Sequence, residues 1–129
     1  MLKLTVPFIP SSINTWSRAH WRTRNADRVE WADRMGDYLL LAGCRKRSPM
    51  FKGKVRVTLV YHIKGKRQHD LDNMSPKHLL DAMIGWVYPD DGPDYVAELV
   101  QSHVHGAKAD ATDIVVEPLA APPRASGTK

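Results

Sequence analysis

Residues 55–63 have the sequence VRVTLVYHI, in which apolar side chains occupy every second position. Because successive side chains of a β-strand point to opposite faces, this alternation predicts a strand with one buried face. Gly65 ends the regular pattern. The segments on both sides of this strand have a different, helical periodicity.

Two helices are expected, one before and one after this strand. In the first, apolar residues recur at helical spacing over Asp27–Ala42, and Gly43 is suited to end it. The second is expected from Ser75 or Pro76 to Val87. Serine can cap a helix and proline is tolerated in the first turn.

Three further strands complete the predicted sheet, at Leu2–Pro7, Tyr95–Val104 and Asp113–Val116. The order strand, helix, strand, helix, strand, strand predicts an α/β (α+β) fold with a single mixed sheet and two main helices packed on it. Residues 1–119 are expected to form one domain. Residues 120–129 are rich in Pro, Ala, Ser and Gly and are predicted to be a disordered tail.

The composition restricts the class of protein. The chain has 129 residues, of which 43% are hydrophobic, and a formal net charge of +5. An excess of positive charge favours polyanionic partners such as nucleic acid. The single cysteine, Cys44, excludes an internal disulfide and a Cys-x-x-Cys zinc site. Since no membrane span or secretory signal is recognisable, a cytoplasmic location is expected.

Acidic residues cluster on both sides of the second predicted helix. In extended chain, the carboxylates of Asp70 and Asp72 point to the same side. Asp90 and Asp91 occupy a tight turn after the helix, and one of them is expected to join the first two. Such oxygen ligands suit Mg²⁺, which relieves the repulsion between carboxylates and polarises a phosphodiester. Lys77 is placed to neutralise charge on that phosphate.

The same residues have a purely structural interpretation. Asp-x-Asp-Asn before a helix is a good capping sequence, and Asp-Asp-Gly is a common surface turn. Lys77 and Asp81 could form an ordinary helical i,i+4 ion pair, which contributes only ~0.2–0.5 kcal/mol. The joint occurrence of these motifs around one helix in a basic chain favours the metal site.

Basic residues suited to contact DNA are found in several segments. The first interleaves Trp16 and Trp21 with basic residues, which could contact phosphates while the indoles stack on unpaired bases. The alternative is a solvated basic loop that its tryptophans anchor to the core. The second segment lies just before the acidic cluster, and residues 45–54 form a further basic loop. The candidate DNA-binding residues are Arg18, His20, Arg22, Arg24, Lys66, Arg67, His69 and Lys77.

His103 and His105 share a face of their predicted strand. A zinc site there lacks a third histidine or a cysteine nearby, so plain strand residues are favoured.

The acidic block resembles the RusA family of Holliday junction resolvases, found in bacteria and their prophages. The family pattern is Asp-x-Asp-Asn, then a lysine, an aspartate one helical turn later and a late Asp-Asp turn. The proline- and asparagine-bearing segment 6–14 also looks like the start of that family, and the similarity covers about residues 3–117. The matching acidic-block residues are Asp70, Asp72, Asn73, Lys77, Asp81, Asp90 and Asp91.

This resemblance implies a homodimeric endodeoxyribonuclease that resolves four-way DNA junctions by paired symmetric nicks, in recombination and repair. It implies dependence on Mg²⁺, with Mn²⁺ as a substitute. Asp70, Asp72 and Asp91 would be the essential carboxylates and Lys77 the essential lysine, with Asp90 as the alternative ligand in its turn. Two other functions remain open: a branched-DNA-binding protein without cleavage, and a metal-dependent phosphodiesterase acting on other nucleic acid structures.

Overall fold

The computed structural model describes residues 1–10, 21–65 and 75–119, with only the backbone described for residues 21–28. The predicted disordered tail lies outside these ranges. No helix in the described ranges combines the length and the hydropathy needed to cross a membrane. The elements follow the predicted order: β1 (Leu2–Val6), α2 (Trp21–Leu41), β2 (Val55–Lys64), α3 (Lys77–Ala82), β3 (Val96–Ala107) and β4 (Ala111–Pro118).

The four strands form one mixed sheet in the order β1-β4-β2-β3. β4 is antiparallel to both of its neighbours, and β2 is parallel to β3. The predicted single mixed sheet is therefore confirmed, although β3 and β4 are longer than expected. The turn after β3 crosses the end of β2, where the Asp110 carboxylate accepts a hydrogen bond of 2.9 Å from the backbone N–H of Lys64.

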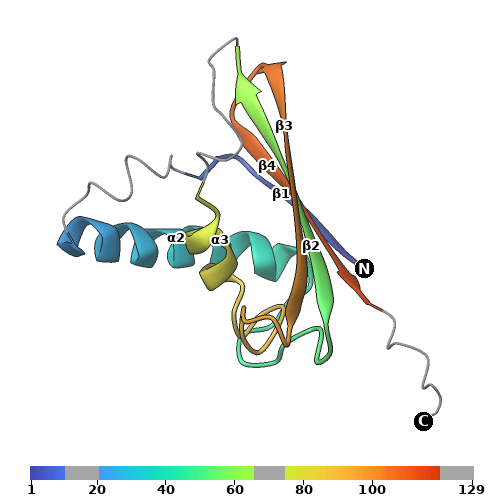
Figure 1. Ribbon diagram of the computed structural model, residues 1–129. Helices are drawn as coiled ribbons and strands as arrows, with labels where there is room; N and C mark the ends of the chain where they lie inside the picture. Colours follow the sequence, from blue (N-terminus) through green and yellow to red (C-terminus); the bar gives the residue numbers. More distant parts are fainter. Residues whose placement is uncertain (11–20, 66–74, 120–129) are drawn as a thin grey trace.

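The alternating strand β2 lies inside the sheet and supplies much of the core. Both helices lie on the same face of the sheet (Figure 1). The apolar side chains of β2 are buried, as the period of two predicts, whereas the residues between them are only partly buried. The fully buried set of this strand is Val55, Val57, Leu59, Tyr61 and Ile63.

The long helix α2 begins at Trp21, earlier than the predicted Asp27, so the expected start was wrong. Its core contact comes from Met35 and Leu39, which are fully buried. At the C-terminal end, Gly43 adopts a φ of 93°, and the N–H of Cys44 donates to the carbonyl of Leu39 at 2.9 Å. This geometry confirms the predicted stop, since glycine adopts a positive φ without steric cost.

Helix α3 is shorter than predicted, because it ends at Ala82 and not at Val87. Gly85 adopts a φ of 84°, and its N–H donates to the carbonyl of Tyr88 at 2.8 Å, which turns the chain back. Met83 and Val87 are still buried, so the apolar spacing reflects packing of a turn-rich segment. The predicted capping by Ser75 is also wrong: the N-cap is Pro76, without a side-chain hydrogen bond.

Candidate active site

The described residues include only part of the predicted site. Lys77, Asp90 and Asp91 lie within them, whereas the other predicted residues do not have described side chains. The convergence of Asp70 and Asp72 with the Asp90–Asp91 turn therefore stays a prediction. Arg22 and Arg24 lie in the first turns of α2, where only the backbone is described. The residues outside the described ranges are Arg18, His20, Lys66, Arg67, His69, Asp70 and Asp72.

Lys77 and Asp81 lie on one face of α3, one helical turn apart. The distance between Lys77 Nζ and Asp81 Oδ2 is 3.7 Å. The lysine side chain is 59% exposed and the aspartate side chain 23% exposed. An ion pair this exposed contributes little to folding. The ion pair acts on its surroundings instead, because it keeps the Lys77 ammonium beside the Asp81 carboxylate.

Tyr88 anchors the chain where it returns from α3 toward the acidic turn. Its ring is fully buried, and its hydroxyl donates a hydrogen bond of 2.8 Å to the carbonyl oxygen of Leu80. Burial raises the pKa of Tyr88 well above its usual range, and the negative charges of three carboxylates raise it further. The three carboxylates are those of Asp91, Asp81 and Asp90, so the acidic turn and α3 both lie near this tyrosine.

The central feature of the site is the contact between Asp81 and Asp91. Burial raises the pKa of Asp91, and Asp81 raises it further through a hydrogen bond between the two carboxyl groups and through charge repulsion. Lys77 opposes this shift, because its ammonium group favours the ionised carboxylate. Two carboxyl groups thus share one corner of the protein, with a single lysine as their described counter-charge.

The two aspartates of the turn have different environments. Asp91 is partly buried and faces α3, whereas Asp90 is exposed. An Oδ atom of Asp90 lies 3.1 Å from the position that a Cβ would take at Gly92, so this side chain folds over the turn itself. The sequence does not decide whether Asp90 or Asp91 belongs to the site, and the structure places Asp91 beside Asp81 of α3.

A basic loop adjoins the segment that precedes this corner in the chain. The basic loop, residues 45–54, is hydrogen-bonded to the segment that leads into the acidic turn. The N–H of Met50 donates to Trp86 O at 3.2 Å, and the N–H of Phe51 donates to Val87 O at 2.9 Å. Figure 1 shows the two loops side by side below the helices. The exposed basic residues of the loop are Arg45, Lys46, Arg47, Lys52 and Lys54.

The donor set at the Asp81–Asp91 corner fits a hard divalent cation, because carboxylate oxygens are the ligands that Mg²⁺ prefers. A cation would also relieve the repulsion that raises the pKa of Asp91. Within the described ranges, however, no group of three or more His, Cys, Asp or Glu residues is close enough to hold a metal ion. Two carboxylates need further ligands from the substrate, from water or from elsewhere in the chain.

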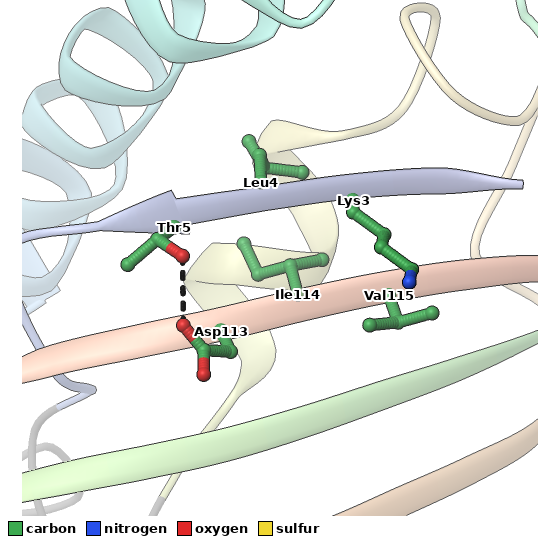
Figure 2. A pocket seen from close by; sticks show the side chains of 6 residues that line it. All are labelled: Lys3, Leu4, Thr5, Asp113, Ile114 and Val115. Carbon is green, nitrogen blue, oxygen red and sulfur yellow. Dashed lines mark hydrogen bonds between the residues drawn. The ribbon is translucent and has the colours of Figure 1, made fainter.

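A second polar cluster lies on the sheet face that the helices leave uncovered. A shallow hollow of about 340 Å³ between β1 and β4 contains the Asp113 carboxylate (Figure 2). Thr5 Oγ1 donates to Asp113 Oδ1 at 2.7 Å, and His62 Nε2 lies 2.7 Å from Oδ2. Burial alone would raise the pKa of Asp113, but these two partners lower it overall. Both carboxylate oxygens are engaged, so the cluster joins strands rather than forming a vacant site.

His103 and His105 lie on the same face of β3, as predicted, and their ring centroids are 4.9 Å apart. The Nδ1 atom of His103 is buried and has no hydrogen-bond partner in the described part of the chain. Two imidazoles alone do not complete a zinc site, which takes four ligands. Their interpretation as strand residues is retained.

The sequence includes Asp81 in the acidic block without assigning it a catalytic or metal-binding role, and it does not single out Tyr88. A signal for Asp81 is present in the sequence, since it lies one helical turn after Lys77. Tyr88 gives no such signal, because an aromatic residue after a buried valine is typical of any core. Its role appears only when its hydroxyl is seen bound to Leu80.

Comparisons with known proteins add no identification. The chain matches no known protein-family model, and no curated protein sequence is significantly similar to it. The class that the fold and the site define is therefore a mixed α+β domain with a carboxylate pair beside a basic loop.

Proposed function

We propose that this protein is a divalent-metal-dependent endodeoxyribonuclease, acting in the cytoplasm as a homodimer on four-way DNA junctions. The observation that carries the proposal is the Asp81–Asp91 carboxyl pair, with Lys77 beside it and the basic loop adjoining the same corner. The resemblance of the acidic block to RusA resolvases supplies the junction as substrate. Recombination and repair are the processes this activity would serve.

In this proposal each described residue has a separate role. Asp91 would hold the cation together with Asp70 and Asp72, and Asp81 would position Asp91 and Lys77. When bound, Mg²⁺ or Mn²⁺ would activate water and stabilise the charge on the scissile phosphate. The Lys77 ammonium, which is largely exposed, would contact that phosphate directly. The basic loop would bind the flanking DNA backbone through its lysines and arginines.

The acidic pair in a basic neighbourhood is hard to explain as structure alone. A protein with a formal net charge of +5 gains nothing in solubility from two carboxyl groups that repel each other. The burial of Asp91 and its repulsion from Asp81 raise the pKa of Asp91, and this destabilises the folded protein at neutral pH. Such a cost is typical of functional sites, where perturbed carboxyl groups meet a charged ligand.

The test is cleavage of a synthetic mobile four-way junction in the presence of Mg²⁺. The purified wild type, Asp91→Asn, Asp72→Asn and the exposed control Asp94→Asn are compared, and the products are resolved on a denaturing gel. We expect paired symmetric nicks by the wild type and Asp94→Asn. Both site variants should lose at least about 100-fold in rate, equivalent to roughly 2.7 kcal/mol of transition-state stabilisation.

Parallel reactions with flap, duplex and RNA substrates separate the alternatives. Faster cleavage of any of these than of the junction would replace the resolvase by a phosphodiesterase of different specificity. Junction binding without nicking by the wild type, unchanged in Asp91→Asn, would leave a branched-DNA-binding protein.

A further inference from the structure

The strand β3 forms one edge of the sheet, and no described strand pairs with its outer side. Edge strands present unpaired N–H and C=O groups, and proteins usually protect them from pairing with other chains. The opposite edge strand, β1, has that protection. It is only five residues long, carries the exposed Lys3, and is followed directly by Pro7.

β3 has none of these protective features. It spans twelve residues and contains no proline, lysine or arginine. Its one carboxylate, Glu98, is bound by the Arg56 guanidinium at 2.5 Å, so its charge is already paired. Large apolar side chains are exposed along it: Leu99 is 38% exposed, Val100 45% and Val104 48%. An exposed, long, apolar edge of this kind is a site for strand pairing.

The central part of β3 is also regular. Its register with β2 is continuous from the pair Arg56–Glu98 to the pair Ile63–His105, and the irregularities fall outside that range. A bulge would twist the edge away from a partner. Without one between residues 98 and 105, the free edge is suited to accept a further strand.

The side chains of β3 are arranged almost symmetrically about Ser102. Val100 and Val104 lie two residues before and after it, so all three lie on one face, the face without helices. Gln101 and His103 flank it on the other face. In an antiparallel pair related by a two-fold axis at Ser102, each Val100 lies opposite Val104 of the partner subunit. The small serine meets its own copy at the axis.

We propose that two copies of this chain associate through β3, antiparallel and centred on Ser102, which joins their sheets into one of eight strands. The four valines then form an apolar cluster across the axis, and the exposed backbone groups of both edges become paired. This assigns an interface to the homodimer of the proposed function and in that respect rests on it. The edge argument itself uses no property of the acidic corner.

The register is tested by a single cysteine at the axis. Directly opposite residues in an antiparallel pair have Cα atoms about 4.5–5.5 Å apart, within the range of a disulfide. We expect Ser102→Cys to form a covalent dimer under mild oxidation. The wild type serves as control for Cys44, which is buried. Thr58→Cys, on the same face of the interior strand β2, should not be cross-linked.

The association is tested by light scattering with size-exclusion chromatography at 5–100 µM protein, a range of about 20-fold. The wild type is expected to be a dimer. Val100→Lys and Val104→Lys each place like charges near the axis and should raise the dissociation constant at least about 10-fold. Val115→Lys, on the same sheet face but on the interior strand β4, should leave it unchanged. Circular dichroism establishes that each variant is folded.

A monomeric wild type overturns this inference, and so does a dimer that both lysine variants leave intact. Neither measurement involves cleavage. If the protein is a monomer that nicks junctions, the proposed interface is wrong and the nuclease proposal stands. If Ser102→Cys links a dimer that does not nick junctions, the interface stands and the nuclease proposal is wrong.

Discussion

The carboxyl group of Asp81 acts directly on that of Asp91 and raises its pKa, although one lies on helix α3 and the other in the turn that follows the segment anchored by Tyr88. The Asp81 carboxyl therefore disfavours ionisation of Asp91. Lys77 offsets this effect only in part. This relationship leads to predictions on stability, on metal binding and on the tyrosine that maintains it.

The first prediction concerns the stability of the metal-free protein. Because the pKa of Asp91 is raised by folding, the folded state is penalised at every pH above the usual pKa of an aspartate. Asp91→Asn removes the penalty and should stabilise the protein at pH 7.5 in EDTA. Since the carboxyl is partly exposed and screened by water, we expect at most about 1 kcal/mol, or roughly 2–6 °C in Tm.

The pH dependence distinguishes this cause from a general effect of removing a charge. The advantage of Asp91→Asn should shrink as the pH falls through the pKa of Asp91, where the wild-type carboxyl becomes protonated. Asp94→Asn removes an exposed carboxylate nearby and should leave the melting temperature unchanged at all pH values. An equal stabilisation by both variants would show that net charge is the cause.

The second prediction concerns divalent cations. A ligand that binds only the folded state raises its stability by RT ln(1 + [L]/Kd), which is about 2.7 kcal/mol at a concentration 100 times Kd. We expect Mn²⁺ or Mg²⁺ at millimolar concentration to raise the melting temperature of the wild type and of Asp94→Asn. Asp91→Asn should lose most of that shift. Thermal unfolding in NaCl at matched ionic strength controls for screening.

The third prediction concerns Tyr88 as the residue that positions the acidic turn. Tyr88→Phe keeps the buried ring but removes the hydrogen bond to Leu80 O, which should cost about 1–2 kcal/mol of stability. Because the turn loses its anchor, the metal-induced rise in melting temperature should also fall. Tyr61→Phe is the matched control: its hydroxyl donates to Gln101 Oε1 at 2.5 Å, a contact between β2 and β3 that does not involve the acidic turn. It should lower stability without changing the response to metal.

The fourth prediction concerns the strand-joining cluster around Asp113. Folding lowers the pKa of this carboxyl, so its contribution is present above the pKa of an unfolded aspartate and is lost as the pH falls through the folded value. Asp113→Asn should lower stability at pH 7 by less than about 1 kcal/mol, since the His62 and Asp113 side chains are 32% and 41% exposed.

Urea midpoints measured from pH 7 to pH 3 check this prediction. The difference in urea midpoint between the wild type and Asp113→Asn should become smaller as the pH falls. Thr5→Val removes one of the two hydrogen bonds and should therefore lower the midpoint less. A difference that grows toward low pH would contradict the assignment.

Local patterns predicted the elements whose residues are buried on one side only. The alternation of apolar residues in β2 is a local feature of the sequence, and it predicted both the strand and its buried face correctly. The end of α3 was wrong for a physical reason. Leu79, Met83 and Val87 have helical spacing and are all buried, but a tightly turning segment with a positive φ at Gly85 buries the same positions.

The acidic pair could be predicted only in part. Sequence spacing places Lys77 near Asp81, because both lie on one helix. It does not place Asp91 near Asp81 or separate Asp91 from Asp90, since both depend on where Tyr88 is buried. The strand order could not be predicted either, because no local sequence pattern indicates that β4 lies between β1 and β2.

That strand order has a consequence for how the molecule is made. β1, at residues 2–6, pairs only with β4, at residues 111–118, within the described sheet. During synthesis β1 therefore has no strand partner until β4 is made. Contacts this distant in sequence slow folding and leave apolar strands exposed during synthesis. Any truncation that removes β4 should therefore release the N-terminal strand and separate β1 from β2.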